Sequence, residues 1–265
     1  MKSPCKLNIF LKIISRAQDK HLLASRFIRY EKLFDELYFI PLTQAKSTKS
    51  AAKTIKTPCY KDLSLHLKSS THYPDNILFR VIHTLGLLGF NHKLKPFLDA
   101  KALVLIKNIP AQSGLGGASS NAATLLLLLN RLLKLKQKDL FKIGAFLGSD
   151  VNFFLSQAKS ANVYGFGQII KPLKNDCIPE LELEFIKPCS TPHIFKLFKE
   201  QNPKIKKIKS THLEQNSSKA LLKLSPFYLN DLSCVVCKEQ AEIKAKLEEG
   251  YFLSGAGGAV FRERM

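Results

Sequence analysis

Residues 110–123 read Pro110-Ala111-Gln112-Ser113-Gly114-Leu115-Gly116-Gly117-Ala118-Ser119-Ser120-Asn121-Ala122-Ala123, and a run of leucines follows them directly. Small residues let a backbone approach a ligand closely. The first N–H groups of the helix that follows lack helical partners and carry a partial positive charge. The stretch therefore predicts a phosphate-binding loop at a helix N-terminus, with residues 110–120 around the phosphate.

This loop matches neither of the two common nucleotide-binding patterns. No lysine follows the glycines, as a P-loop requires, and the full glycine spacing of a dinucleotide fingerprint is missing. A flexible linker is the plain alternative. It is disfavoured because the glycines and serines adjoin a long apolar helix pattern with no polar spacer between them.

The rest of the chain has mixed helix and strand patterns. A short strand at 102–106 precedes the loop, and a helix is expected from Ser119 to about Leu135. Residues 6–14 predict an N-terminal strand, residues 76–88 a helix that ends before Gly89, and residues 41–60 a loop or an exposed hairpin. Beyond residue 150 we expect a second domain, with strands at 161–164 and 181–186 and helices near 193–200 and 241–249.

The charge balance selects a class of partner. Lys and Arg number 41 against 21 Asp and Glu, a formal net charge of +20. Such a surplus attracts anions, which include nucleic acids, membrane surfaces and phosphorylated metabolites. The lysine-rich segment 196–209 lacks interleaved aromatics after Phe198, so we interpret it as a solvated face rather than a nucleic-acid patch.

The cysteines and the apolar runs predict a cytoplasmic protein. Six cysteines are scattered through a chain without the pattern of a secretory leader, which indicates reduced thiols. Cys234 and Cys237 form a C-x-x-C pair that could bind zinc or act in redox chemistry, but no second ligand pair accompanies them, and helical spacing explains them better. The longest apolar run, residues 125–129, is too short to span a membrane.

Three separated segments together resemble one superfamily. They are Lys6-x-Asn8 within Cys5–Leu11, the glycine loop, and the small-residue segment Ser254–Phe261. Their order resembles that of the GHMP kinases, named for galactose, homoserine, mevalonate and phosphomevalonate kinases. Gly148–Val151 and Thr191–Lys196 extend the resemblance to the kinases of 4-diphosphocytidyl-2-C-methyl-D-erythritol in the non-mevalonate isoprenoid pathway.

The resemblance implies a fold and a reaction. The fold is α+β with the two domains of a GHMP kinase. Residues 1–157 form an N-terminal, ribosomal-protein-S5-domain-2-like domain that holds the ATP loop, and residues 158–265 form a ferredoxin-like C-terminal domain. The reaction is transfer of phosphate from ATP, accompanied by Mg²⁺, to the 2-hydroxyl of the cytidyl substrate. The expected partners are small molecules, with neither nucleic acid nor a membrane.

The resemblance also implies a catalytic pair, Lys6 and Asp150. Asp150 can accept the proton of the substrate hydroxyl. Lys6 can keep Asp150 ionised and place positive charge where the transferred phosphoryl group gathers negative charge. The alternatives are that Lys6 is one more surface lysine and that Asp150 caps the helix or turn after Gly148.

The substrate side is implied by Asn8, His21, Thr191 and Phe195. His21 could bond the cytosine edge while Phe195 offers a stacking face. The chain departs from the family here, because Gln18-Asp19-Lys20-His21 stands where relatives usually have Asp-Gly-Tyr-His. The expected aromatic ring is thus replaced by Lys20.

Two smaller features complete the resemblance. Ala118 stands where many relatives carry another glycine, a change that adds one methyl group. Asn230-Asp231-Leu232 also recurs in the family, but its residue types indicate no chemical role beyond capping a helix.

Two other functions remain open at this point. A kinase of the same superfamily could use homoserine or a mevalonate-type alcohol as acceptor, although the pairing of Lys6 with Asp150 favours the cytidyl substrate. An RNA-binding protein would explain the charge of +20 without any catalysis, and its affinity for RNA would fall steeply with salt.

Overall fold

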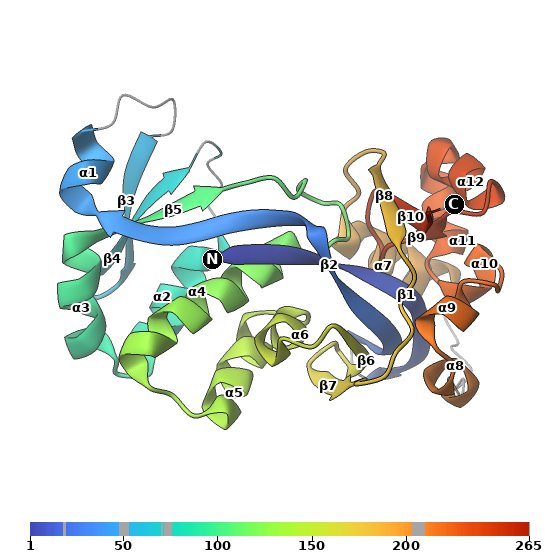
Figure 1. Ribbon diagram of the computed structural model, residues 1–265, viewed down its shortest axis with the longest axis horizontal. Coiled ribbons are helices and arrows are strands. Elements are labelled where there is room, and N and C mark those ends of the chain that lie inside the picture. Colours follow the sequence, from blue (N-terminus) through green and yellow to red (C-terminus); the bar gives the residue numbers. More distant parts are fainter. Residues whose placement is uncertain (18–19, 48–52, 70, 72–75, 203–209, 265) are drawn as a thin grey trace. The chain divides into compact units, whose positions relative to one another are not determined.

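Two long N-terminal strands, β1 (Lys2–Ala17) and β2 (Lys20–Pro41), contribute residues to both compact units of the chain (Figure 1). The computed structural model describes all residues except 18–19, 48–52, 70, 72–75, 203–209 and 265. Unit 1 comprises residues 1–4, 31–109 and 117–155. Unit 2 comprises residues 5–30, 110–116 and 156–265.

The sheet of unit 1 is built on the second half of β2. Residues 36–41 of β2 pair antiparallel with β5 (Lys101–Ile106), and β5 pairs parallel with β4 (Leu63–Ser69). β4 in turn pairs antiparallel with β3 (Lys53–Tyr60). Leu63, Leu65 and Leu67 alternate along β4 and are all buried, which places one face of this strand against the core.

Helices cover this sheet. α2 (Ile77–Leu87) contacts β3 and β4 as well as α4 (Gly117–Leu133), and both helices lie along one face of the sheet (Figure 1). Asn76 caps α2 because its Oδ1 accepts a hydrogen bond from the N–H of Leu78 at 3.1 Å. The other helices of this part of the chain are α1 (Leu42–Ser47), α3 (Asn91–Ala100), α5 (Gln137–Leu147) and α6 (Val151–Ser156).

Unit 2 contains two strand groups. Residues 23–28 of β2 pair antiparallel with β6 (Ser160–Gly165), which pairs antiparallel with β7 (Ile169–Pro172). A separate three-stranded antiparallel sheet has the order β8-β10-β9, formed by β8 (Leu181–Phe185), β9 (Phe252–Leu253) and β10 (Ala259–Glu263).

Three helices of unit 2, α7 (Thr191–Gln201), α11 (Ser233–Glu239) and α12 (Ala241–Glu248), share a core with β1 and this second sheet. Their shared core includes Leu11, Ile13, Phe198, Val235 and Val260, all less than a tenth exposed. Unit 2 also contains the helices α8 (Thr211–Gln215), α9 (Ser218–Leu221) and α10 (Pro226–Leu229).

A buried arginine joins distant segments of unit 2. Arg26 on β2 is 1% exposed, and its Nε donates to Asn162 Oδ1 at 2.6 Å. Its two terminal nitrogens donate to the carbonyl oxygens of Glu214 and Asn216, and Asp176 lies 3.6 Å away. The charge is therefore paired and hydrogen-bonded, as a buried charge must be.

Most predicted elements are present. The mixed α and β content is confirmed, and the strand predicted at 6–14 lies within β1. The helix predicted from Ser119 to Leu135 begins two residues earlier, at Gly117, and ends at Leu133. The strands and helices predicted beyond residue 150 overlap β6, β8, α7 and α12.

The segment 41–60 was only partly predicted. Its second half is indeed a hairpin strand, β3, but residues 42–47 form α1 instead of a loop, and residues 48–52 lie outside the described part of the chain. Residues 203–209 of the lysine-rich segment also lie outside it. The division into domains at residues 157 and 158 stays a prediction. No helix within the described residues is both long and apolar enough to span a membrane.

Candidate functional site

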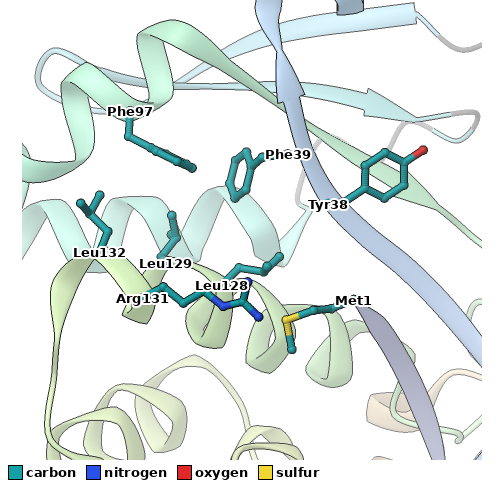
Figure 2. Close-up of a pocket in the computed structure, with 8 residues that line it drawn as sticks. All are labelled: Met1, Tyr38, Phe39, Phe97, Leu128, Leu129, Arg131 and Leu132. Carbon is teal, nitrogen blue, oxygen red and sulfur yellow. The ribbon is translucent and has the colours of Figure 1, made fainter.

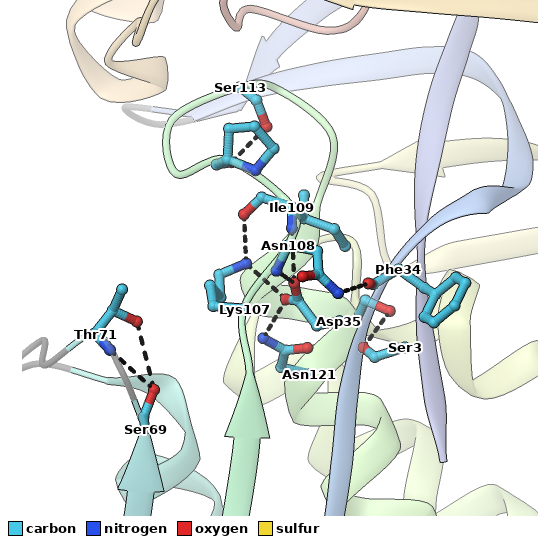
Figure 3. Close-up of polar contacts among 12 residues, drawn as sticks. Ser3, Phe34, Asp35, Ser69, Thr71, Lys107, Asn108, Ile109, Ser113 and Asn121 are labelled. Carbon is cyan, nitrogen blue, oxygen red and sulfur yellow. Dashed lines mark hydrogen bonds and ion pairs between the residues drawn. The ribbon is translucent and has the colours of Figure 1, made fainter. Parts of the chain in front are cut away.

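The glycine loop of unit 2 is held by backbone hydrogen bonds. The N–H of Lys6 donates to Leu115 O at 2.9 Å, and the N–H of Cys189 donates to Gln112 O at 2.8 Å. Within the loop, Ser113 Oγ donates to Pro110 O at 2.7 Å (Figure 3). Gly114 and Gly116 have φ angles of 78° and 71°, the left-handed region that favours glycine.

Not all side chains of the predicted ATP segment face solvent. Ala111, Gln112 and Ala118 are exposed, while Ser113, Leu115 and Ser120 are buried. Ser120 lies in the first turn of α4, and Ser3 Oγ donates to its hydroxyl at 2.8 Å (Figure 3). The inward-facing side chains therefore fix the shape of this segment.

A second glycine turn, residues 254–258, lies against the first loop within unit 2. A Cβ atom added to Gly114 would lie 2.2 Å from Ser254 O, and one added to Gly257 would lie 2.0 Å from Gly114 N. Real Cβ atoms do not approach so closely. Only glycine at these two positions permits the contact between the two backbones.

Lys6 and Asn8 on β1 lie beside these turns. Both are buried, at 4% and 2% exposure, and Lys6 Nζ donates to Asn8 Oδ1. Asn8 Nδ2 donates to Ser25 Oγ at 3.0 Å, and Lys6 Nζ lies 4.6 Å from the ring centre of Phe27. A Cβ on Gly255 would lie 3.3 Å from Lys6 Nζ, so unit 2 brings Lys6, Asn8 and both glycine turns together. The burial of Lys6 disagrees with the alternative of a surface lysine.

Asp150 belongs to unit 1. It lies between α5 and α6, half-buried, in the turn where the N–H of Val151 donates to Gly148 O at 3.3 Å. A Cβ on Gly148 would lie 3.6 Å from Ser119 Oγ, which places this turn beside the first turn of α4. Lys6 and Asp150 lie in different units, and their pairing stays a prediction.

Two of the predicted substrate residues meet in unit 2. The His21 ring lies 5.6 Å from that of Phe195 and 5.7 Å from that of Phe198. Burial lowers the pKa of His21, and the charges of Arg16 and Lys199 lower it further, so the neutral imidazole is favoured. Its buried Nε2 has no hydrogen-bond partner among the described residues.

Thr191 and Asn8 complete the predicted substrate residues. Thr191 is exposed at the start of α7, one helical turn before Phe195, so the two share a face of that helix. Asn8 lies instead beside Lys6 and the glycine turns. Gln18 and Asp19 of the altered segment lie outside the described residues.

Sequence reasoning missed Asp35, which organises the chain just before the glycine loop (Figure 3). Asp35 lies on β2 and is 0% exposed. Its Oδ2 accepts from Lys107 Nζ at 2.6 Å and Asn121 Nδ2 at 2.8 Å, and its Oδ1 accepts from the N–H groups of Asn108 and Ile109 at 2.7 and 2.8 Å. One buried carboxylate thus joins β2, residues 107–109 and α4. No local signal marked Asp35 for burial, because Glu36 follows it directly and Glu31 and Lys32 precede it closely.

Unit 1 also contains an apolar pocket of about 410 Å³ between β2, α3 and α4 (Figure 2). Phe39 and Phe97 meet edge to face on its wall, with ring centres 4.8 Å apart, and Arg131 is its one charged lining residue. None of the predicted catalytic, nucleotide or substrate residues lines this pocket.

No group of three or more His, Cys, Asp or Glu side chains in the described ranges could hold a metal ion. Cys234 and Cys237 lie on one helix, α11, where Cys237 packs against the core and burial raises the pKa of both thiols. The helical interpretation of this pair therefore holds.

The chain is similar in sequence to known kinases over nearly its whole length. The model of the GHMP kinases N terminal domain matches residues 76–158. A 4-diphosphocytidyl-2-C-methyl-D-erythritol kinase from Campylobacter jejuni is 34% identical over 99% of each chain. One from Sulfurimonas denitrificans is 32% identical over 97% of this chain and 94% of its own.

Solved structures agree with these matches. A crystal structure of 4-(cytidine 5'-diphospho)-2C-methyl-D-erythritol kinase has a TM-score of 0.68 and 25% identity, and it covers 98% of this chain and 88% of its own. A phosphotransferase related to the CoA biosynthesis pathway has a TM-score of 0.58 at 9% identity, with 98% and 85% covered, and indicates the fold alone. The predicted α+β, two-domain GHMP kinase fold class is thereby confirmed.

Proposed function

Because the chain belongs to the 4-diphosphocytidyl-2-C-methyl-D-erythritol kinase family, we propose that it transfers the γ-phosphate of ATP to the 2-hydroxyl of that cytidyl substrate. The products are ADP and the 2-phosphate, within the non-mevalonate isoprenoid pathway. The observation that carries the proposal is the meeting of Lys6, Asn8 and both glycine turns in unit 2 of a chain that is similar to these kinases over nearly its whole length.

The nucleotide is assigned to residues 110–120. The left-handed glycines let the loop backbone approach an anion closely, and the N-terminus of α4, which carries a partial positive charge, follows directly in the sequence. Mg²⁺ enters with the nucleotide, as part of the MgATP substrate, and neutralises charge on its phosphate oxygens.

Lys6 and Asp150 are assigned to the chemical step. The substrate hydroxyl gives its proton to Asp150 as its oxygen bonds to the γ-phosphorus, and the bond from that phosphorus to the bridging oxygen of ADP breaks. Lys6 is buried, so its ammonium acts on the phosphoryl oxygens with little screening by water. Asn8 accepts from Lys6 Nζ and orients it.

The cytidyl group is assigned to His21 and Phe195, with Thr191 on the same helix face. A neutral imidazole offers one donor and one acceptor to a base edge, and Nε2 of His21, which has no partner among the residues that the structure describes, is suited to that contact. The Phe195 ring adds a stacking face.

We place this reaction in the cytoplasm, because all six cysteines are reduced thiols that form no disulfide in the structure. The division into domains at residues 157 and 158 belongs to the same proposal.

ADP release by the purified chain tests the proposal. The assay contains ATP and Mg²⁺, with the cytidyl compound, homoserine and mevalonate as alternative acceptors. Turnover with the cytidyl compound alone is the expected result. Turnover only with another alcohol would move the substrate within the superfamily. No turnover at all, from folded protein that binds RNA with a steep salt dependence, would favour the RNA-binding alternative.

A further inference from the structure

Asn230, in the segment between α10 and α11, contacts more than the start of a helix. Asn230 Oδ1 accepts from the N–H of Leu232 at 2.9 Å and Asn230 O accepts from the N–H of Ser233 at 3.1 Å, which forms the turn before α11. The expected helix cap is not formed, because the N-cap of α11 is Leu232, whose side chain makes no capping hydrogen bond. Ser233 Oγ also donates to Asn230 O. These bonds use the oxygens of Asn230 and leave its amide nitrogen for another purpose.

That nitrogen holds the second glycine turn. Asn230 is 3% exposed, and its Nδ2 donates to Gly255 O at 2.8 Å and to Leu253 O at 3.2 Å. Both acceptors are backbone carbonyls where β9 enters the turn. A buried carbonyl needs a partner, and here one side chain serves two of them.

The same turn touches the proposed catalytic residues. Gly255 has a φ of 64°, and a Cβ there would lie 3.2 Å from Asn8 Oδ1, 3.3 Å from Lys6 Nζ and 3.4 Å from Gly114 O. The backbone of residue 255 is therefore in contact with the catalytic strand on one side and the glycine loop on the other. A shift of about 1 Å in such a contact can lower turnover roughly a hundredfold.

Asp231 ties this segment to the strand that carries Lys6. The N–H of Asp231 donates to Leu11 O at 3.0 Å, its Oδ2 accepts from the N–H of Ile13 at 2.8 Å, and its Oδ1 accepts from Lys12 Nζ. Residues 230 and 231 thus hold the glycine turn and β1 together, and all of these contacts lie within unit 2.

We propose that Asn230 is a positioning residue, which through Gly255 O sets the second glycine turn against Lys6, Asn8 and the nucleotide loop. The inference rests on the proposed function and adds to it a residue that touches no substrate. It requires the amide donor specifically, because a carboxylate at this position would face two carbonyl oxygens.

Substitutions that keep a side-chain oxygen separate the two roles of Asn230. Asn230→Ser and Asn230→Asp both retain an oxygen that can accept from the N–H of Leu232, but neither can donate to Gly255 O as the amide does. Ser233→Ala is the matched control, because it removes a buried hydrogen bond to Asn230 O and leaves the turn untouched. Circular dichroism melting would establish that each variant is folded.

Three readouts decide the matter: the Kd for a fluorescent ATP analogue without acceptor, kcat with the cytidyl compound, and deuterium uptake by residues 254–259. For both Asn230 variants we expect the Kd to rise about tenfold, kcat to fall roughly a hundredfold and uptake in this segment to increase. For Ser233→Ala we expect Kd and kcat within about twofold of the wild type. If the Asn230 variants match this control in Kd and kcat, the inference is wrong.

Failure of the proposed function would look different. A wild-type chain that binds the ATP analogue but does not phosphorylate the cytidyl compound would overturn the acceptor, while the Kd and the deuterium uptake would still decide the role of Asn230. If the Asn230 variants are too unstable to assay at 25 °C, the same three readouts are taken at the highest temperature at which circular dichroism shows them folded. A wild type that binds no ATP analogue would overturn both proposals.

Discussion

Replacing Asp35 by Asn should destabilise the chain strongly. Its carboxylate is fully buried and accepts four hydrogen bonds, one of them from Lys107 Nζ. The amide of Asn carries no charge and has only one acceptor oxygen. Whichever way the amide turns, Lys107 loses its carboxylate and at least one buried donor faces another donor.

The magnitude follows from the burial of the pair. The side chains of Asp35 and Lys107 are 0% and 14% exposed. Removing one partner of a buried ion pair costs about 3–5 kcal/mol, and the oxygen that Asn retains favours the lower end. A loss of about 3 kcal/mol in the free energy of unfolding corresponds, for a chain of this size, to a Tm lower by roughly 6–12 °C.

Urea denaturation followed by circular dichroism measures this loss. Asp99→Asn is the matched control, because its ion pair with Lys95 is about half exposed and should contribute little. The double variant Asp35→Asn, Lys107→Met should lose less than the sum of the two single variants, since the two side chains interact directly. A loss below about 1 kcal/mol for Asp35→Asn would refute the assignment of a buried, fully bonded carboxylate.

Three further outcomes are expected. Asp150→Asn should lower kcat at least a hundredfold with an unchanged Kd for ATP, and near-full turnover would remove Asp150 from the mechanism. Gly257→Ala should abolish soluble folded protein, because its methyl group would lie 2.0 Å from Gly114 N. Gly250→Asn is the control and should remain folded in a melting assay, because the space around Gly250 is open and Asn tolerates its left-handed φ. The pKa of His21 in the folded state is lowered from 6.5, so the unfolded state binds a proton first and the free energy of unfolding falls as the pH drops below 6.5. His21→Gln should flatten this pH dependence, measured by denaturant titrations at several pH values. An unchanged dependence of the free energy of unfolding on pH would contradict the burial of a neutral imidazole.

The sequence was most informative where the signal is local. The glycine loop and α4 were predicted because small residues and an apolar helix pattern lie side by side in the chain. The approach of Lys6 to residues 254–258 has no local signal at all, and only the resemblance to a kinase family led us to expect those segments in one site.

The 22-residue strand β2 was not predicted, because charged residues interrupt its apolar pattern. Arg26 and Asp35 are tolerated there since partners far along the chain satisfy them. The partners of Arg26 lie 136 to 190 residues away, and those of Asp35 lie 72 to 86 residues away. No window of sequence contains both members of such a pair, so their burial could not be predicted from spacing.

The interleaved make-up of unit 2 has a consequence for synthesis on the ribosome. Lys6 is made about 250 residues before residues 254–258, the turn that contacts it. At about 5–20 residues per second, β1 waits roughly 12 to 50 s for those partners. During that interval the apolar side chains of β1 lack these late partners and can contact other segments wrongly. We therefore expect chaperones to bind the nascent chain rather than the finished enzyme.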